Sequence, residues 1–418
     1  MTTPETSLQK GALGGFLLAA LLILILRKPE ALFAAQLWAE DGPIFLKQEH
    51  DFGPAAMFIP YAGYLCMLQR LVAFAAGFAP LLWIPTVYAW ASFFIFAGVC
   101  AVILFSSRLS ISDLSRMAWV ATLVLVPHSG EVYLNLTNAP WITITLLIVF
   151  LLSRPALTRN QWIADALLLA LLGLTGPCLI LLFPLLLWKS FHTRQHRSAN
   201  LWLPLIALGT CLIQAELIAQ SGRTALPSVN TDIFEWLKLA IHFSGGLFLG
   251  VERPERFGFW VALVLSLVPM ALTLWLFFSQ KRERSHFHVA AWMLPAAGAL
   301  VFGGAVMSVR DLPSALRFFN GGRYFYVPYV TLIWCYLLFV FEKESRFSQR
   351  AVAAFLLALV AYSTSTHFHA KKQGRFEFAR YVESYEQGQA VSFVVPPSAE
   401  WKVDLDPHEQ WRGRFKWF

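Results

Sequence analysis

Long apolar stretches separated by short polar or basic segments make up most of this chain. A helix that crosses a bilayer needs roughly 20 mostly apolar residues, and fewer where the helical bundle is thin. Eight stretches meet this criterion and are predicted membrane spans. They cover residues 11–26, 84–105, 139–152, 201–220, 257–278, 288–309, 325–341 and 351–366.

Three further stretches decide the topology. Residues 61–80 carry Arg70 at their centre, and we predict that they lie in the membrane interface. Residues 117–127 are short but apolar, which favours a tilted span. Residues 162–188 are interrupted by Gly-Leu-Thr-Gly-Pro at 173–177 and have basic residues on both flanks, so we predict two short helices. The Gly-Pro sequence is either a tight hairpin turn or the lining of a cavity.

With residues 61–80 in the interface, the chain has about eleven spans and a cytoplasmic N-terminus. The loops on the inner side then hold 14 basic residues, whereas the facing loops 127–138 and 173–177 hold none. Short cytoplasmic loops of membrane proteins show this excess of Lys and Arg. Arg27 and Lys28, directly after the first span, contradict the rule.

The composition agrees with a membrane protein. Of 418 residues, 57% are hydrophobic and 14% are charged, against about 45–50% and about 25% in a soluble chain. These values exclude a disordered, coiled-coil or collagen-like chain. The net charge of +8 arises in the short loops, and no nucleic-acid motif accompanies it.

We predict two parts, a transmembrane domain at residues 1–366 and an extracytoplasmic tail at 367–418. In the tail, residues 373–387 have an amphipathic helical pattern, and residues 391–395 form one strand that ends at Pro396-Pro397. A tail of about 50 residues is too short for a core of its own. We therefore expect this small α/β unit to pack on the outer loops.

The first candidate site segment contains two adjacent acids, Glu40 and Asp41, in an apolar and aromatic setting. Desolvation raises the pKa of a carboxyl group toward the range that suits a general base. An alternative is that Asp41, which Gly42 and Pro43 follow, caps a helix N-terminus.

The second and third segments lie on the same predicted side. Amide and carboxylate groups at 127–141 suit the binding of sugar hydroxyls, although Ser129 and Asn138 could instead cap helices. Around residue 320, arginines beside Gly321-Gly322 suit an anion, because arginine binds phosphate through two N–H groups; interfacial anchoring is the alternative. The candidates are His128, Glu131, Asn135, Asn138 and Trp141 for sugar or acceptor, and Arg317, Arg323 and Tyr324 for phosphate.

In these segments the chain resembles the GT-C class of membrane glycosyltransferases, over roughly residues 10–330. The similarity rests on Trp-Ala-Glu-Asp-Gly at 38–42, on Gly-Glu…Asn-Leu-Thr-Asn…Trp at 130–141 and on Gly-Arg-Tyr-Phe at 322–325. It implies an all-α polytopic fold with interfacial helices in the first outer loop. It also implies inverting transfer of a sugar from a polyprenyl-phosphate donor to a glycolipid or glycan hydroxyl, at the outer face of a bacterial inner membrane.

On this resemblance Asp41 is the expected base and Glu40 the second candidate. No cofactor and no metal site are expected, and dependence on a divalent cation is left open. Two alternative functions remain: a lipid or solute transporter or flippase, and a glycan polymerase or ligase. A transporter typically carries charges near the midplane and repeated halves.

Overall fold

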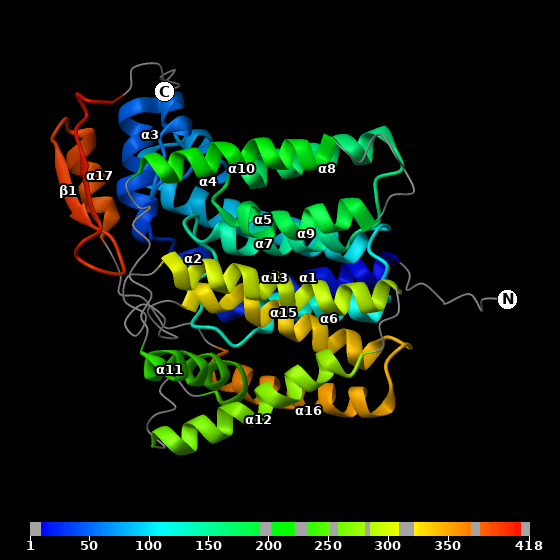
Figure 1. Cartoon of the computed structure of the whole chain (residues 1–418). Coiled ribbons are helices and arrows are strands. Elements are labelled where there is room, and N and C mark those ends of the chain that lie inside the picture. Colours follow the sequence, from blue (N-terminus) through cyan, green and yellow to red (C-terminus); the bar gives the residue numbers. More distant parts are fainter. Residues whose placement is uncertain are drawn as a thin grey trace.

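The computed structural model describes residues 10–192, 202–221, 232–250, 258–280, 285–308, 322–368 and 377–410. Most of the long helices lie side by side and share one general direction (Figure 1). The first helix, α1 (Lys10–Arg27), begins at one end of this bundle, which we call the N-terminal end. The opposite end carries the C-terminal tail, and we call it the tail end.

Seven helices of the described residues are long and apolar enough to cross a membrane, which identifies an integral membrane protein. The predicted spans 84–105 and 139–152 coincide with helices, and the boundaries of the other predicted spans shift by one to four residues. The seven are α1, the stretch Leu81–Phe105 that contains α5 (Ile84–Phe105), α10 (Trp202–Gln220), α12 (Phe259–Phe278), α13 (His286–Ser308), α15 (Gly322–Phe341) and α16 (Phe347–Thr366).

Four shorter helices pack between these seven. They are α6 (Asp113–Leu125), α7 (Ala139–Leu152), α8 (Arg159–Gly173) and α9 (Cys178–His192). The predicted break of residues 162–188 into two helices is confirmed. The Gln214 side chain donates to the carbonyls of Gly173 and Gly176, so this segment forms a hairpin turn that is fastened to α10.

Stacked indoles fasten the centre of the bundle. Trp119 of α6 and Trp334 of α15 lie 4.5 Å apart between ring centroids. Each indole N–H donates to the backbone carbonyl of the other residue. Because both indoles are fully buried, this reciprocal pairing gives their N–H groups the acceptors that lipid could not supply.

The remaining elements near α12 and α16 are α11 (Ile233–Ser244) and the π-helix η5 (Gly245–Leu249).

Short helices form the segment between α1 and α5 at the tail end. The longest, α4, has ten residues and is therefore about 15 Å long, half the thickness of the hydrocarbon core. Its Arg70 is buried and donates to the carbonyls of Ile44 and Ile59, so it holds the segment together. The elements are α2 (Glu30–Phe33), η1 (Ala39–Asp41), η2 (Gly42–Leu46), α3 (Lys47–Phe52), η3 (Gly53–Phe58), α4 (Met67–Ala76) and η4 (Leu81–Trp83).

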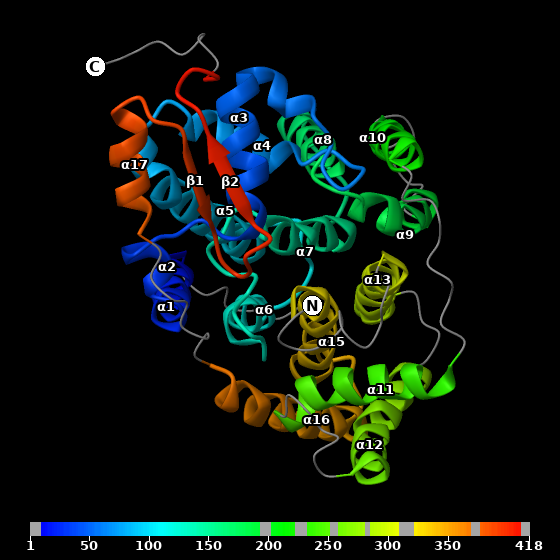
Figure 2. The same ribbon diagram turned by 90° about the vertical axis from the view of Figure 1, so that its left-hand side faces the viewer.

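The tail consists of α17 (Phe378–Glu386) and an antiparallel pair, β1 (Val391–Val394) and β2 (Lys402–Leu405). The second strand was not predicted. Figure 2 shows the strands lying over the short helices that follow α1, and Phe393, Val395 and Val403 share an apolar core with Leu37 and Phe45. The expected packing of the tail on this segment is confirmed.

Candidate functional site

The three segments singled out in the sequence meet at the tail end. Asp41 is hydrogen-bonded to Thr137 of the loop between α6 and α7. Earlier in that loop, Glu131 is paired with Arg323 in the first turn of α15. Residues nearly 300 positions apart in the sequence therefore form one continuous polar patch in the described part of the chain.

Asp41 is fully buried, and its carboxylate accepts three hydrogen bonds. Oδ1 accepts from the N–H and the hydroxyl of Thr137, at 2.8 and 2.7 Å. Oδ2 accepts from the backbone N–H of Trp38 at 3.2 Å. The helix-cap alternative is wrong, because the side chain caps no helix that starts at Gly42 and instead joins two loops. Burial raises the pKa of Asp41 to about 7, although the hydrogen bonds from Thr137 oppose the increase.

Glu40 is held by fewer contacts than its neighbour. Its Oε1 accepts from the Tyr61 hydroxyl at 3.2 Å. Its Oε2 is buried and has no hydrogen-bond partner among the described residues. The indole N–H of Trp38, two residues earlier, is likewise buried without a described partner. A buried polar atom without a partner costs about 1–3 kcal/mol, so both atoms retain an unmet capacity to form a hydrogen bond.

The C-terminal tail contacts and holds the backbone of the segment that carries Glu40 and Asp41. Ala39 has a φ of +46°, a left-handed conformation that costs a non-glycine residue about 1 kcal/mol or more. Its N–H donates to the Pro396 carbonyl at 2.6 Å. A Cβ atom at Gly42 would lie 2.6 Å from a methyl carbon of Val403. Only glycine therefore allows β2 to approach the segment so closely.

Arg323 lies in the first turn of α15 and forms one end of the patch. Its Nη1 donates to Oε1 of Glu131 at 2.9 Å, its guanidinium lies over the Tyr324 ring, and it interacts electrostatically with Glu40. Trp141 packs edge-to-face on Tyr324, with 5.5 Å between centroids. The Arg323 side chain remains 28% exposed, so part of the guanidinium faces outward.

Close approach explains the glycine that precedes Arg323. A Cβ atom on Gly322 would lie 2.6 Å from the Ser129 hydroxyl oxygen. Glycine at this position therefore lets the start of α15 touch the loop between α6 and α7. This contact brings Arg323 within reach of Glu131.

Asn135 and Asn138 form their side-chain hydrogen bonds within the loop between α6 and α7. Asn135 donates to the carbonyl of Glu131 at 2.6 Å and accepts from the N–H of Asn138. Asn138 donates to the same carbonyl at 3.1 Å, so the proposed capping of α7 by the Asn138 side chain is wrong. Ser129 Oγ and Asn138 Oδ1 are buried without a described partner.

His128 faces the interior of the bundle. The side chain is fully buried, contacts the rings of Tyr133 and Tyr326 edge-on, and accepts at Nδ1 from the Gly130 N–H. Burial lowers the pKa of His128 to about 3, and the neighbouring cation Arg27 contributes to the decrease. The imidazole is therefore neutral at pH 7 and supports the loop.

Sequence reasoning missed the roles of Arg27 and Lys28. Arg27 is buried and donates to the carbonyls of Val126 and His128, at 2.9 and 3.0 Å. Lys28 donates to the Gly130 and Tyr133 carbonyls, and burial lowers its pKa to about 8. The sequence contained a signal for these roles: Arg27 and Lys28 are two basic residues at the predicted outer end of the first span, where the positive-inside rule predicts none.

Two predictions remain untested by this geometry. Arg317 lies outside the described residues. Among the residues that are described, no three His, Cys, Asp or Glu side chains are grouped as a metal site requires. Whether the protein depends on a divalent cation is not tested by this finding. Comparison of the chain with protein-family models, with curated proteins and with solved structures finds no match.

Proposed function

We propose that this protein is an inverting GT-C-like membrane glycosyltransferase that uses a polyprenyl-phosphate-linked sugar. The observation that carries the proposal is that an underbonded carboxylate, Glu40, and a partly exposed arginine, Arg323, belong to one polar patch at one end of an apolar bundle, joined through Asp41, Thr137 and Glu131. Such a pair supplies both groups that the reaction needs. These are a base for the acceptor hydroxyl and a cation for the departing phosphate.

The proposed topology has about eleven spans, with the N-terminal end in the cytoplasm and the tail end outside. The basic loops lie at the N-terminal end, as the positive-inside rule requires. The loops there are too short to form a soluble nucleotide-binding domain. A donor carried by a membrane lipid fits this arrangement, because its phosphate would lie at the membrane surface beside Arg323.

In the proposed reaction the acceptor hydroxyl oxygen attacks the anomeric carbon from the face opposite the phosphate. The new carbon–oxygen bond forms as the bond to the phosphate oxygen breaks, and the electron pair leaves with the polyprenyl phosphate. The hydroxyl proton passes to a carboxylate. Arg323, aided by Tyr324, stabilises the negative charge on the leaving phosphate.

The hydrogen bonds favour Glu40 as the group that takes the proton. Asp41, the base expected from the sequence, already accepts three hydrogen bonds and has 1% of its surface exposed. Glu40 has an oxygen with no described partner. We assign Asp41 to positioning, because its bonds to Thr137 hold Glu40 near the loop that carries Glu131.

The test is transfer by the purified chain from lipid-linked sugars, with Glu40→Gln and Asp41→Asn compared. Loss of a general base costs on the order of 10²–10⁴-fold in rate, so Glu40→Gln should lose that much while it still binds donor. Asp41→Asn should retain most activity, because an amide oxygen can accept from Thr137. Glu400→Gln, on the exposed tail, is the control.

Loss of transfer in Asp41→Asn alone would return the base to Asp41. If both variants transferred sugar at the wild-type rate, neither acid would be the base. If the wild-type chain moved lipid-linked sugar across vesicles without transfer, the enzyme proposal would be abandoned in favour of a flippase.

A further inference from the structure

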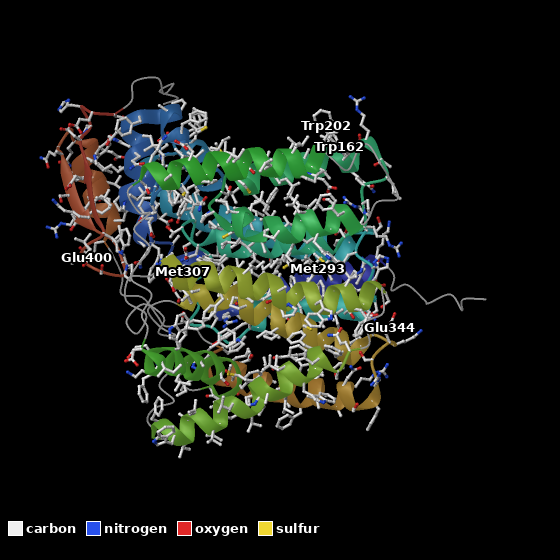
Figure 3. All side chains as sticks on the ribbon, viewed as in Figure 1. Trp162, Trp202, Met293, Met307, Glu344 and Glu400 are labelled. Carbon is white, nitrogen blue, oxygen red and sulfur yellow. The ribbon has the colours of Figure 1, made fainter. Side chains whose placement is uncertain are left out.

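A hollow lies at the N-terminal end of the bundle, away from the candidate site. It is a cavity of about 160 Å³ among the last turns of α7, α9 and α15 and the first turns of α13. At roughly 30 Å³ per water molecule, it has room for about five waters or one small polar group. Figure 3 shows Glu344, which lines it, at the end of the molecule opposite Glu400 of the tail.

Charged groups of both signs line this cavity. Lys189 is held in place because its Nζ donates to the carbonyls of Phe150 and Ser153, at 2.6 and 2.7 Å. Glu342 is fixed by hydrogen bonds from Ser112 and Ser115 to its Oε1. The lining therefore combines a lysine side chain with a glutamate carboxylate, each held in place by hydrogen bonds.

Two more charged residues of the lining remain available. Arg154 follows α7 and Glu344 follows α15. Within the described residues, neither side chain makes a hydrogen bond or an ion pair, and both residues are exposed. The cavity thus presents one available cation and one available anion, and its charged lining is balanced.

The position of the cavity suggests which molecule it meets. The helices that surround it begin or end there, so it lies at the depth where a bilayer's hydrocarbon gives way to headgroups. Trp188, which lines it, is 43% exposed, and tryptophan is enriched at this depth. Apolar side chains such as Trp119 and Leu338 form the rest of the wall.

We propose that this cavity binds the headgroup of a zwitterionic phospholipid of the phosphoethanolamine class. The phosphate would meet Arg154 and Lys189, and the primary ammonium would meet Glu342 and Glu344. An acidic headgroup would satisfy only the cations and would face two carboxylates. A trimethylated ammonium has no N–H to donate, so a choline headgroup would lose the hydrogen bonds to the glutamates.

The experiment is native mass spectrometry of the purified full chain in detergent, titrated with phosphatidylethanolamine, phosphatidylglycerol and phosphatidylcholine. Phosphatidylethanolamine should bind more tightly than either of the others. Arg154→Ala and Glu344→Gln should each weaken its binding about two- to fivefold, since these contacts lie at a solvated rim. Arg159→Ala, an exposed arginine on the next helix that does not line the cavity, should leave the binding unchanged.

Three outcomes would overturn the proposal: preference for phosphatidylglycerol, equal binding of all three lipids, or wild-type binding in both variants. The replaced side chains are exposed and unbonded, and thermal unfolding without added lipid will verify that the variants fold. The readout is lipid binding, so it is independent of whether the chain transfers a sugar.

Discussion

Two arginines at the N-terminal end differ in their surroundings from three basic residues at the tail end. Arg154 and Arg159 are exposed, although Lys189 at the same end donates to backbone carbonyls. At the tail end, Arg27, Lys28 and Arg70 are buried and donate chiefly to backbone carbonyls. Arg27 connects the end of α1 with the end of α6 and the loop that follows, and Lys28 adds bonds to that loop.

The difference shows that basic residues which depart from the positive-inside rule can indicate a buried structural role. A solvated cation obeys the positive-inside rule because its position is set by membrane insertion. A buried cation that violates it must be held by specific acceptors, because burial of a charge without partners is costly. At the tail end these acceptors are the carbonyls of the loop that carries the candidate site residues.

The largest expected effect is that of Arg27→Met. The substitution leaves the carbonyls of Val126 and His128 buried without their donor, and each lost partner costs about 1–3 kcal/mol. We expect the free energy of unfolding to fall by about 3–5 kcal/mol. Urea or thermal unfolding in detergent measures it. A change below about 1 kcal/mol would show that Arg27 is not the connecting residue.

The pH dependence of stability should reveal the raised pKa of Asp41. Its pKa is about 7 in the folded protein and about 3.9 in an unfolded chain, so the folded state binds the proton more tightly. Stability should therefore fall as pH rises from about 4 to about 7, by up to about 4 kcal/mol at 1.36 kcal/mol per pKa unit.

Asp41→Asn tests this prediction, because an amide does not titrate. The melting temperature of the variant should depend less on pH than that of the wild type between pH 4.5 and 7.5. Thr137→Ser, which keeps the hydroxyl that bonds Asp41, serves as the control and should retain the wild-type slope. Parallel pH profiles for wild type and Asp41→Asn would mean that Asp41 titrates near its ordinary pKa.

An intermediate effect is expected at the N-terminal end. Arg108 donates to both carboxylate oxygens of Asp165, at 2.8 and 2.7 Å. Asp165→Asn should cost about 2–3 kcal/mol, less than a fully buried pair, because Arg108 reaches water. A double-mutant cycle with Arg108→Ala isolates the pair, and additive single effects would show no coupling.

The smallest effect is expected for Arg159→Ala. This arginine is exposed in the first turn of α8 and makes no side-chain bond with another described residue. We expect a change in stability within about 0.5 kcal/mol. A loss comparable to that of Arg27→Met would erase the distinction between the two ends.

The sequence alone determined the membrane character, the location of most helices and the helical break near Gly173. It did so because apolar length and helix-breaking residues act locally, whatever the rest of the chain does. The same pattern gave α17 and the first strand of the tail. It did not give β2, since the pairing of Val391 with Leu405 depends on a partner strand.

Only the tertiary structure decided what the polar residues contact. It gave Asp41 three hydrogen-bond donors and left Glu40 with one, although the two acids are neighbours in the sequence. It buried Arg27 and set Glu131 against Arg323 across 192 positions. Hydrogen bonds and burial depend on which distant segments meet, and no local pattern in the chain carries that information.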